Sequence, residues 1–270
     1  MAMQRTLMVN DHVISYRVVG KGSPVMLVHG FGEDGRVWEK QEAVLEKNFL
    51  LIIPDLPGSG QSEATEDMSM EGLARVLKLI LDRLSIDTCI MVGHSMGGYI
   101  TLAFADLFPD RLKAFGLFHS TAYADNEEKK TARRRGIEFI LEQGPVKFLE
   151  QSTRNLFSEE FRKKNPVEVQ EFIDRFTNFP AQSLVSYYEA MMQRPDRTQV
   201  LRQFTGPVMF IIGKYDSAIL PDQVLEQCHL PRLAYIQLLM HSGHLGMIEE
   251  ADASTGFLEK FLKDCAMPLA

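Results

Sequence analysis

The chain has 270 residues, 45% of them hydrophobic and 24% charged, and a formal net charge of −7, the composition of a globular protein with one large or two small α/β domains. The sequence contains no stripe of basic residues, which argues against nucleic acid as a partner. No apolar run reaches the ~18 residues of a membrane span, which argues against a membrane as a partner. The three scattered cysteines, Cys89, Cys228 and Cys265, form no CxxC pair, so we expect a protein of the reducing cytoplasm without disulfides.

The chain begins with a predicted hairpin. Residues 6–19, TLMVNDHVISYRVV, contain two β-rich runs about a tight turn at Asn10-Asp11, and these polar residues also distinguish this start from a signal peptide. Six short apolar runs follow, separated by longer stretches with helical patterning. They are PVMLVHG, LLIIPD, CIMVGHS, LKAFGLFHS, GPVMFIIG and LAYIQLLM. Most are apolar at successive positions, which indicates strands covered on both faces, and their alternation with helices predicts a layered, mostly parallel α/β fold.

One long stretch interrupts this alternation. Residues 122–201 contain no predicted strand, and four segments in them have helical patterning. Residues 122–204 hold 14 basic and 13 acidic side chains, so this region is nearly neutral and most of the negative charge lies elsewhere. We interpret the stretch as an all-helical cap over one edge of the sheet; a set of peripheral crossover helices is the alternative. The expected organisation is a core in two parts, 1–121 and 202–270, with the cap at 122–201.

The motif GHSMG follows the predicted strand at residues 89–94 and precedes a predicted helix. A serine on a sharp strand-to-helix turn requires glycines two residues to either side, here Gly93 and Gly97, because larger side chains would collide there. The helix N-terminus beside such a serine favours developing negative charge. We therefore interpret Ser95 as a nucleophile; a simple connecting turn is the alternative.

A serine hydroxyl needs a general base, and the sequence LLMHSGHLGMIEE offers two histidines after the last predicted strand. His244 lies further into the loop, just before an amphipathic helix, and is the expected base. His241 is interpreted as a loop histidine. The seven histidines of the chain also include His119, which follows another strand and is a tentative residue of the substrate pocket.

The base needs an acid that holds its tautomer and stabilises its charged form. Asp216 lies in VMFIIGKYDSAILP, shortly after a continuous apolar run, and is the expected acid. Asp125, after the preceding strand, is a weaker rival. The resulting order along the chain is Ser95, Asp216 and His244.

The transition state also needs hydrogen-bond donors for the oxyanion, each worth about 3–4 kcal/mol. One expected donor is the backbone N–H of Met96, which directly follows the nucleophile. The other is the backbone N–H of Phe31, in the loop LVHGFGEDGRVW after an early strand. Backbone atoms act in both cases, so the side chains are free to line the pocket.

These motifs together resemble the α/β-hydrolase superfamily, in its esterase/haloperoxidase-like branch of capped serine hydrolases. HGFGEDGRVW resembles the oxyanion loop, GHSMGG the nucleophile elbow, GKYDSAILP the acid loop and SGHLGMIEE the histidine loop. DLPGSGQS, residues 55–62, resembles the D-x-x-G-x-G-x-S turn, which we interpret as structural. The resemblance covers the chain from about Val25 to Glu250. It implies an eight-stranded, mostly parallel sheet flanked by helices, and acyl-enzyme chemistry that uses water and no cofactor.

Departures from relatives narrow the expected reaction. Haloalkane dehalogenases and epoxide hydrolases use aspartate where this chain has Ser95. C–C bond hydrolases usually have asparagine, and homoserine acetyltransferases glycine, where this chain has His94. We therefore expect a carboxylesterase for small or medium acyl esters. A C–C bond hydrolase, thioesterase or lactonase with the same triad is the alternative, and a ligand receptor of the same fold is the alternative from another class.

Other signals are weak. The chain contains no H-E-x-x-H motif, and no metal is expected. The run Arg133-Arg134-Arg135 is interpreted as a solvated helix face, with binding of an acidic substrate as the alternative. Residues 187–192, YYEAMM, either roof the pocket or pack within the cap.

Overall fold

The computed structural model describes residues 3–266. They begin with the predicted hairpin of β1 (Met3–Val9) and β2 (His12–Gly20), which pair antiparallel. Asn10 and Asp11 have φ of 45° and 66°, the left-handed conformations that a two-residue type I′ turn requires at both positions.

The sheet has eight strands in the order β1-β2-β4-β3-β5-β6-β7-β8. β2 pairs antiparallel with β4, and all pairs beyond that are parallel. This confirms the predicted mostly parallel sheet with an antiparallel start. The six further strands are β3 (Ser23–Val28), β4 (Phe49–Pro54), β5 (Cys89–His94), β6 (Leu112–Phe118), β7 (Val208–Gly213) and β8 (Ala234–Leu239).

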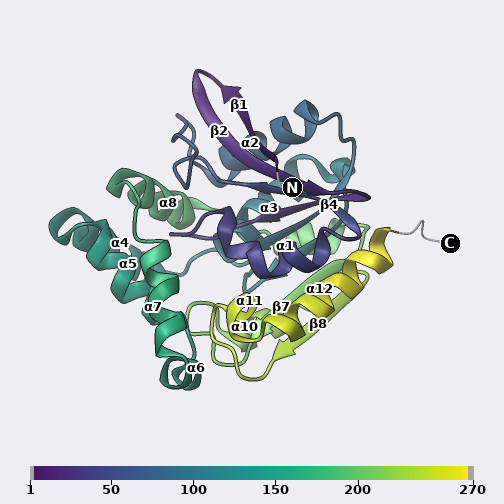
Figure 1. Ribbon diagram of the computed structural model, residues 1–270. Coiled ribbons are helices and arrows are strands. Elements are labelled where there is room, and N and C mark those ends of the chain that lie inside the picture. The colour runs from purple at the N-terminus through teal and green to yellow at the C-terminus, as the bar shows by residue number, and fades with distance from the viewer. Residues whose placement is uncertain (1–2, 267–270) are drawn as a thin grey trace.

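Helices cover both faces of the sheet, so successive strand residues enter different cores. Met26 and Ile52 belong to one buried cluster, and their neighbours Leu27 and Leu51 to the other. This explains why the strands are apolar at successive positions. One face is covered by α2 (Met70–Arg83) and α3 (Met96–Leu107), the other by η1 (Gly35–Trp38), α1 (Glu39–Leu45) and α12 (Ala251–Ala266) (Figure 1).

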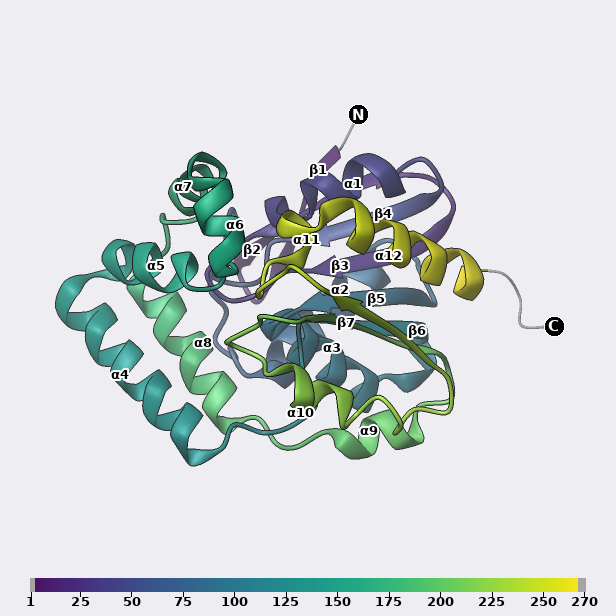
Figure 2. The ribbon, with the colours of Figure 1, turned by 90° about the horizontal axis from the view of Figure 1, so that it is seen from below.

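A helical insertion joins β6 to β7. Its helices are α4 (Glu127–Gln143), α5 (Pro145–Arg154), α6 (Glu159–Lys164), α7 (Pro166–Arg175), α8 (Ala181–Gln193) and α9 (Thr198–Gln203). Figures 1 and 2 show α4, α5, α7 and α8 together at one side of the core. The four segments with helical patterning correspond to α4, α5, α7 and α8, and the short helices α6 and α9 lie outside them.

Three short elements remain outside the insertion. They are η2 (Pro109–Arg111) before β6, α10 (Pro221–Leu225) after β7, and α11 (Gly246–Glu249) after β8. Within residues 3–266, no helix combines the length and the apolar character that crossing a bilayer would require.

Candidate active site

Ser95 occupies a strained turn between β5 and α3. Its backbone has φ 52° and ψ −116°, in the left-handed half of conformational space that non-glycine residues rarely enter. A Cβ atom on Gly93 would lie 2.1 Å from the carbonyl oxygen of Gly97, and one on Gly97 would lie 2.5 Å from the carbonyl oxygens of Val28 and His29. The steric reason that the sequence offered for these two glycines is therefore confirmed.

The substitution Gly97→Ala tests this close packing. Because the new methyl group would push against the backbone at the end of β3, we expect it to lower the free energy of unfolding by about 1–3 kcal/mol. Urea unfolding followed by circular dichroism measures the change. Gly256→Ala in α12 is the matched control: an added Cβ there has open space, and loss of a helical glycine should raise stability by about 0.5–1 kcal/mol. Equal effects of the two substitutions would contradict the packing argument.

Asp216 and His244, predicted from separate loops, contact each other directly. Asp216 follows β7 and His244 follows β8, and Nδ1 of His244 lies 2.7 Å from Oδ2 of Asp216. The other carboxylate oxygen accepts hydrogen bonds from the N–H groups of Ala218 and Ile219, both at 2.9 Å. Burial opposes charge on Asp216, but the attraction and hydrogen bonds of His244 and His119 hold its pKa well below the ordinary value. A charged carboxylate at this place fixes the hydrogen of His244 on Nδ1.

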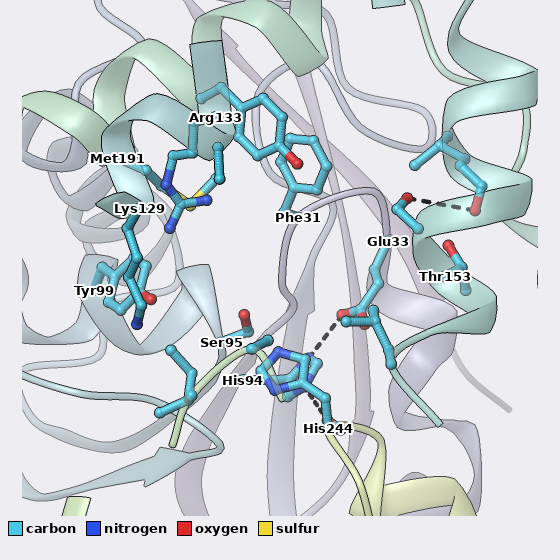
Figure 3. Close-up of a pocket in the computed structure, with 17 residues that line it drawn as sticks. Phe31, Glu33, His94, Ser95, Tyr99, Lys129, Arg133, Thr153, Met191 and His244 are labelled. Atoms are coloured by element: carbon cyan, nitrogen blue, oxygen red, sulfur yellow. Dashed lines mark hydrogen bonds and ion pairs between the residues drawn. The ribbon is translucent and has the colours of Figure 1, made fainter. Parts of the chain in front are cut away.

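The same arrangement leaves Nε2 of His244 as the nitrogen that can take a proton. Ser95 and His244 line one cavity, and Figure 3 shows the two side chains at its base. The structure therefore brings together, from three loops, the three residues that the sequence nominated. Side chains of these three types in one place can supply a nucleophile, a base and an orienting acid.

The alternatives that the sequence left open lie elsewhere. Asp125 is buried between two guanidinium groups, Arg133 at 2.5 Å and Arg194 at 2.9 Å. The ring of His241 is exposed and lies 3.7 Å from Glu160 at the surface. Neither contacts the Asp216–His244 pair, so the structure favours the residues that the sequence preferred.

His119, expected as a pocket residue, lies behind Asp216 instead of on the cavity wall. Its Nδ1 is 3.2 Å from Oδ2 of Asp216, and its side chain is fully buried. The N–H groups of Gly213 and Gly246 approach its two ring nitrogens, each at 3.1 Å, so a doubly protonated ring would face donors. Burial lowers the pKa of His119 to about 4. We therefore reassign His119 from the pocket to the support of the acid.

His119, Asp216 and His244 each also have an atom of a type that binds metal ions, and these atoms lie within 4.8 Å of one another. Their acceptor atoms are already engaged: Asp216 accepts from His244 and from two backbone N–H groups, and whichever ring nitrogen of His119 carries no hydrogen faces a backbone N–H. A cation would have to displace these donors. The residues present do not fit a metal site.

The two expected oxyanion donors come from the start of α3 and from the loop after β3. Met96 is the first residue of α3, where backbone N–H groups have no acceptor within the helix. Phe31 lies in the loop after β3, and its side chain lines the same cavity as Ser95. Asp55, in the turn that the sequence analysis took as structural, accepts a hydrogen bond from the N–H of Gly35 and so secures the far end of this loop.

A buried pair that the sequence did not predict lies directly beside the nucleophile. The ring of His94 contacts a carboxylate oxygen of Glu33 at 2.9 Å through Nδ1, and the carbonyl oxygen of His244 at 3.0 Å through Nε2. Both contacts are acceptors, so the ring donates from both nitrogens and is an imidazolium. Burial opposes both charges, but their attraction and hydrogen bonding raise the pKa of His94 and lower that of Glu33. Glu33 also accepts from the N–H of Gly30, so the pair joins the oxyanion loop to the histidine loop.

The buried pair predicts a particular dependence of stability on pH. Because the folded pKa of His94 is raised above its ordinary 6.5, the bound proton stabilises the fold below that value and its contribution is lost as the pH rises through the folded pKa. Glu33 contributes above its ordinary 4.5 and loses its contribution as the pH falls through its lowered pKa. Urea unfolding between pH 4 and 9 should show a decline at the alkaline end. The double variant Glu33→Gln/His94→Gln should lack this decline; an identical profile would refute the ion pair.

The cavity above Ser95 has a volume of about 240 Å³, and residues of the core and of the insertion line it. Tyr188 of α8 stacks on Phe31 of the core, with ring centres 4.3 Å apart and an interplanar angle of 7°. Its neighbour Tyr187 is buried and donates a hydrogen bond at 2.5 Å to the carbonyl oxygen of Pro57. Thus Tyr188 and Met191 line the cavity, while Tyr187 fastens the insertion to the core.

Known proteins are similar to this chain in sequence and in fold. A family model described as the alpha/beta hydrolase fold matches residues 23–251. The chain is 24% identical over 240 residues to 3-oxoadipate enol-lactonase 1 of Acinetobacter baylyi, a match that covers 88% of both proteins. It is similar to the malate-bound structure of a thermophilic esterase from Thermogutta terrifontis, with a TM-score of 0.90, 26% identity, and coverage of 99% of this chain and 100% of that one. An uncharacterized protein of Mycobacterium tuberculosis is 37% identical over 102 residues, which span 36% of this chain and 30% of that protein.

Proposed function

The chain belongs to the α/β-hydrolase fold family, and we propose that within it this protein is a serine hydrolase, a carboxylesterase for esters with small or medium acyl groups. The observation that carries the proposal is the 2.7 Å contact between His244 and Asp216, with His244 at the base of the same cavity as the strained Ser95. A hydroxyl lifted from a tight turn next to an oriented imidazole is the arrangement that nucleophilic catalysis requires.

The reaction follows from this geometry. Nε2 of His244 takes the proton as Oγ of Ser95 attacks the ester carbonyl, and Asp216 stabilises the imidazolium that forms. The N–H groups of Met96 and Phe31 stabilise the oxyanion. His244 then donates its proton to the departing alcohol, which leaves an acyl group on Ser95. A water molecule, deprotonated by the same histidine, attacks this acyl group and releases the acid.

Substrate size is set by the insertion, which acts in this proposal as the cap expected at residues 122–201. Its helices supply Lys129, Arg133, Tyr188 and Met191 to the cavity. The cavity of about 240 Å³ is smaller than the roughly 300–1,000 Å³ of sites for drug-sized ligands, which supports small or medium acyl esters as substrates.

A lactone is the second candidate substrate. The observation that favours it is the similarity, over most of both chains, to an enol-lactonase. The chemistry is the same, since a lactone is an internal ester whose leaving alcohol remains attached to the acyl group. A panel of p-nitrophenyl esters from acetate to octanoate, tested beside five- and six-membered lactones, distinguishes the two.

Covalent labelling tests the proposed function itself. A fluorophosphonate probe should attach one label to each molecule of the purified protein, and peptide mass spectrometry should locate the label on Ser95. Turnover of at least one short-chain ester should accompany labelling. A protein that is neither labelled nor active on any ester or lactone of the panel would refute the proposal.

A further inference from the structure

The wall of the cavity carries uncompensated positive charge. Four charged side chains line it, and two of these, Glu33 and His94, neutralise each other. The other two are Lys129 and Arg133, four residues apart on α4 and therefore on one face of that helix. Figure 3 shows both on the side of the cavity next to Tyr99 and Met191, across from Glu33 and Thr153.

The acidic groups near this wall do not balance it. Asp125 pairs with Arg133, but the same carboxylate also pairs with Arg194, so one negative charge serves two guanidinium groups. Burial opposes the charge on Asp125, but hydrogen bonds and attraction from Arg133 and Arg194 keep its pKa below the ordinary value, and the charge stays in place. Within residues 3–266, Lys129 has no ion pair, unlike Lys130 beside it, which pairs with Glu127. Lys129, Arg133 and Arg194 together carry three positive charges against the one negative charge of Asp125, an excess of two.

The two cations differ in mobility. Arg133 is fixed, because Asp125 holds its Nε and Tyr188 packs against its guanidinium, 5.4 Å from ring centre to Cζ. Lys129 is half-buried and unpaired, so its flexible stem lets the ammonium group adjust to a ligand. Arg134 and Arg135, which complete the basic run, are exposed. The solvated-face interpretation therefore holds for two residues of the run and fails for Arg133.

We propose that Lys129 and Arg133 form a subsite for a carboxylate group of the substrate. The inference rests on the proposed hydrolase function and names its substrate class: esters in which an apolar chain separates the scissile carbonyl from a free carboxylate. The separating chain is apolar because the lining of the cavity also includes Leu149, Leu156, Met191 and Ile219. A charge-assisted hydrogen bond in this partly enclosed site is stronger than one in open water.

The experiment compares matched pairs of methyl esters by pH-stat titration. Monomethyl succinate, glutarate and adipate carry a terminal carboxylate, and methyl butyrate, pentanoate and hexanoate have the same acyl lengths without it. We expect kcat/KM to favour the charged ester by at least about tenfold for one length, the value of one charge-assisted hydrogen bond. A second pair, 4-acetoxybutyrate and butyl acetate, places the carboxylate on the alcohol part of the ester. A preference for 4-acetoxybutyrate supports the subsite and means that the alcohol part, instead of the acyl part, reaches Lys129 and Arg133.

Two variants locate the effect. Lys129→Gln should lower the ratio of charged to neutral kcat/KM by about tenfold. Arg134→Gln removes the same charge from the exposed side of α4 and should leave the ratio unchanged. Equal kcat/KM values for the charged and the neutral esters in both pairings would overturn the subsite. Equal changes of the ratio in the two variants would overturn it as well.

Failure of the subsite and failure of the hydrolase proposal give different results. If the protein is an active esterase without preference for charged esters, the subsite is refuted and the hydrolase proposal stands. A protein inactive on every ester loses the function, and the subsite is then decided by calorimetric titration of Ser95→Ala with monomethyl adipate. Binding that weakens about tenfold when Lys129→Gln is added supports the subsite; binding unaffected by that substitution, or no binding, overturns it.

Discussion

Replacing Ser95 by alanine is expected to lower kcat/KM for a short-chain ester by about 10⁴–10⁶-fold, because the variant loses the only atom that forms the acyl-enzyme. His244 and Asp216 keep their 2.7 Å contact in this variant, since that contact does not involve the Ser95 hydroxyl. The residual rate then reports water attacking in place of the serine. Initial rates with p-nitrophenyl butyrate measure the loss, and fluorophosphonate labelling should disappear with it.

A second substitution at the same position separates catalysis from folding. Ser95→Gly should be as inactive as Ser95→Ala, yet it should raise the free energy of unfolding by about 1 kcal/mol, because glycine tolerates a φ of 52° without the strain of a side chain. Urea unfolding of the three proteins gives the comparison. An inactive glycine variant that is less stable than the wild type would mean that the turn is not strained, and substantial activity in either variant would mean that Ser95 is not the nucleophile.

Much of the fold and the centre of the site are predictable because they depend on local patterns. The strand preceding Ser95, the two glycines beside it and the loops of Asp216 and His244 are each recognisable within about a dozen residues. Parallel strands place their carboxyl ends at one edge of a sheet, so three such loops converge without further information. A local pattern also predicted the hairpin, since Asn10 and Asp11 are residues that favour a tight turn.

The features that escaped prediction depend on pairs of residues distant in the chain. Glu33 and His94 are 61 positions apart, and nothing in either segment shows that a carboxylate will meet that ring. His119 follows a strand end, as a pocket residue would, but whether it faces the cavity or Asp216 is decided by side-chain packing. The basic run on α4 was ambiguous for the same reason, because the orientation of that helix decides which arginine turns inward.

Asp216→Asn is expected to lower kcat/KM by about 10⁴-fold while the protein remains folded. The amide oxygen can keep the hydrogen bonds from Ala218 and Ile219 that the carboxylate now accepts. The amide nitrogen then faces Nδ1 of His244 and donates to it, so the ring carries its hydrogen on Nε2 instead. A histidine in this tautomer cannot take a proton from Ser95.

Asp125→Asn is the matched control, because Asp125 is the rival acid that the sequence offered after a strand. It contacts Arg133 and Arg194 and not His244, so the substitution should destabilise the insertion and change kcat/KM for a neutral ester by no more than about tenfold. Near-ultraviolet circular dichroism establishes that both variants are folded at the assay temperature. A folded Asp125→Asn protein as inactive as Asp216→Asn would transfer the role of the acid to Asp125. Full activity of Asp216→Asn would show that His244 needs no orienting carboxylate, and the 2.7 Å contact would then be structural.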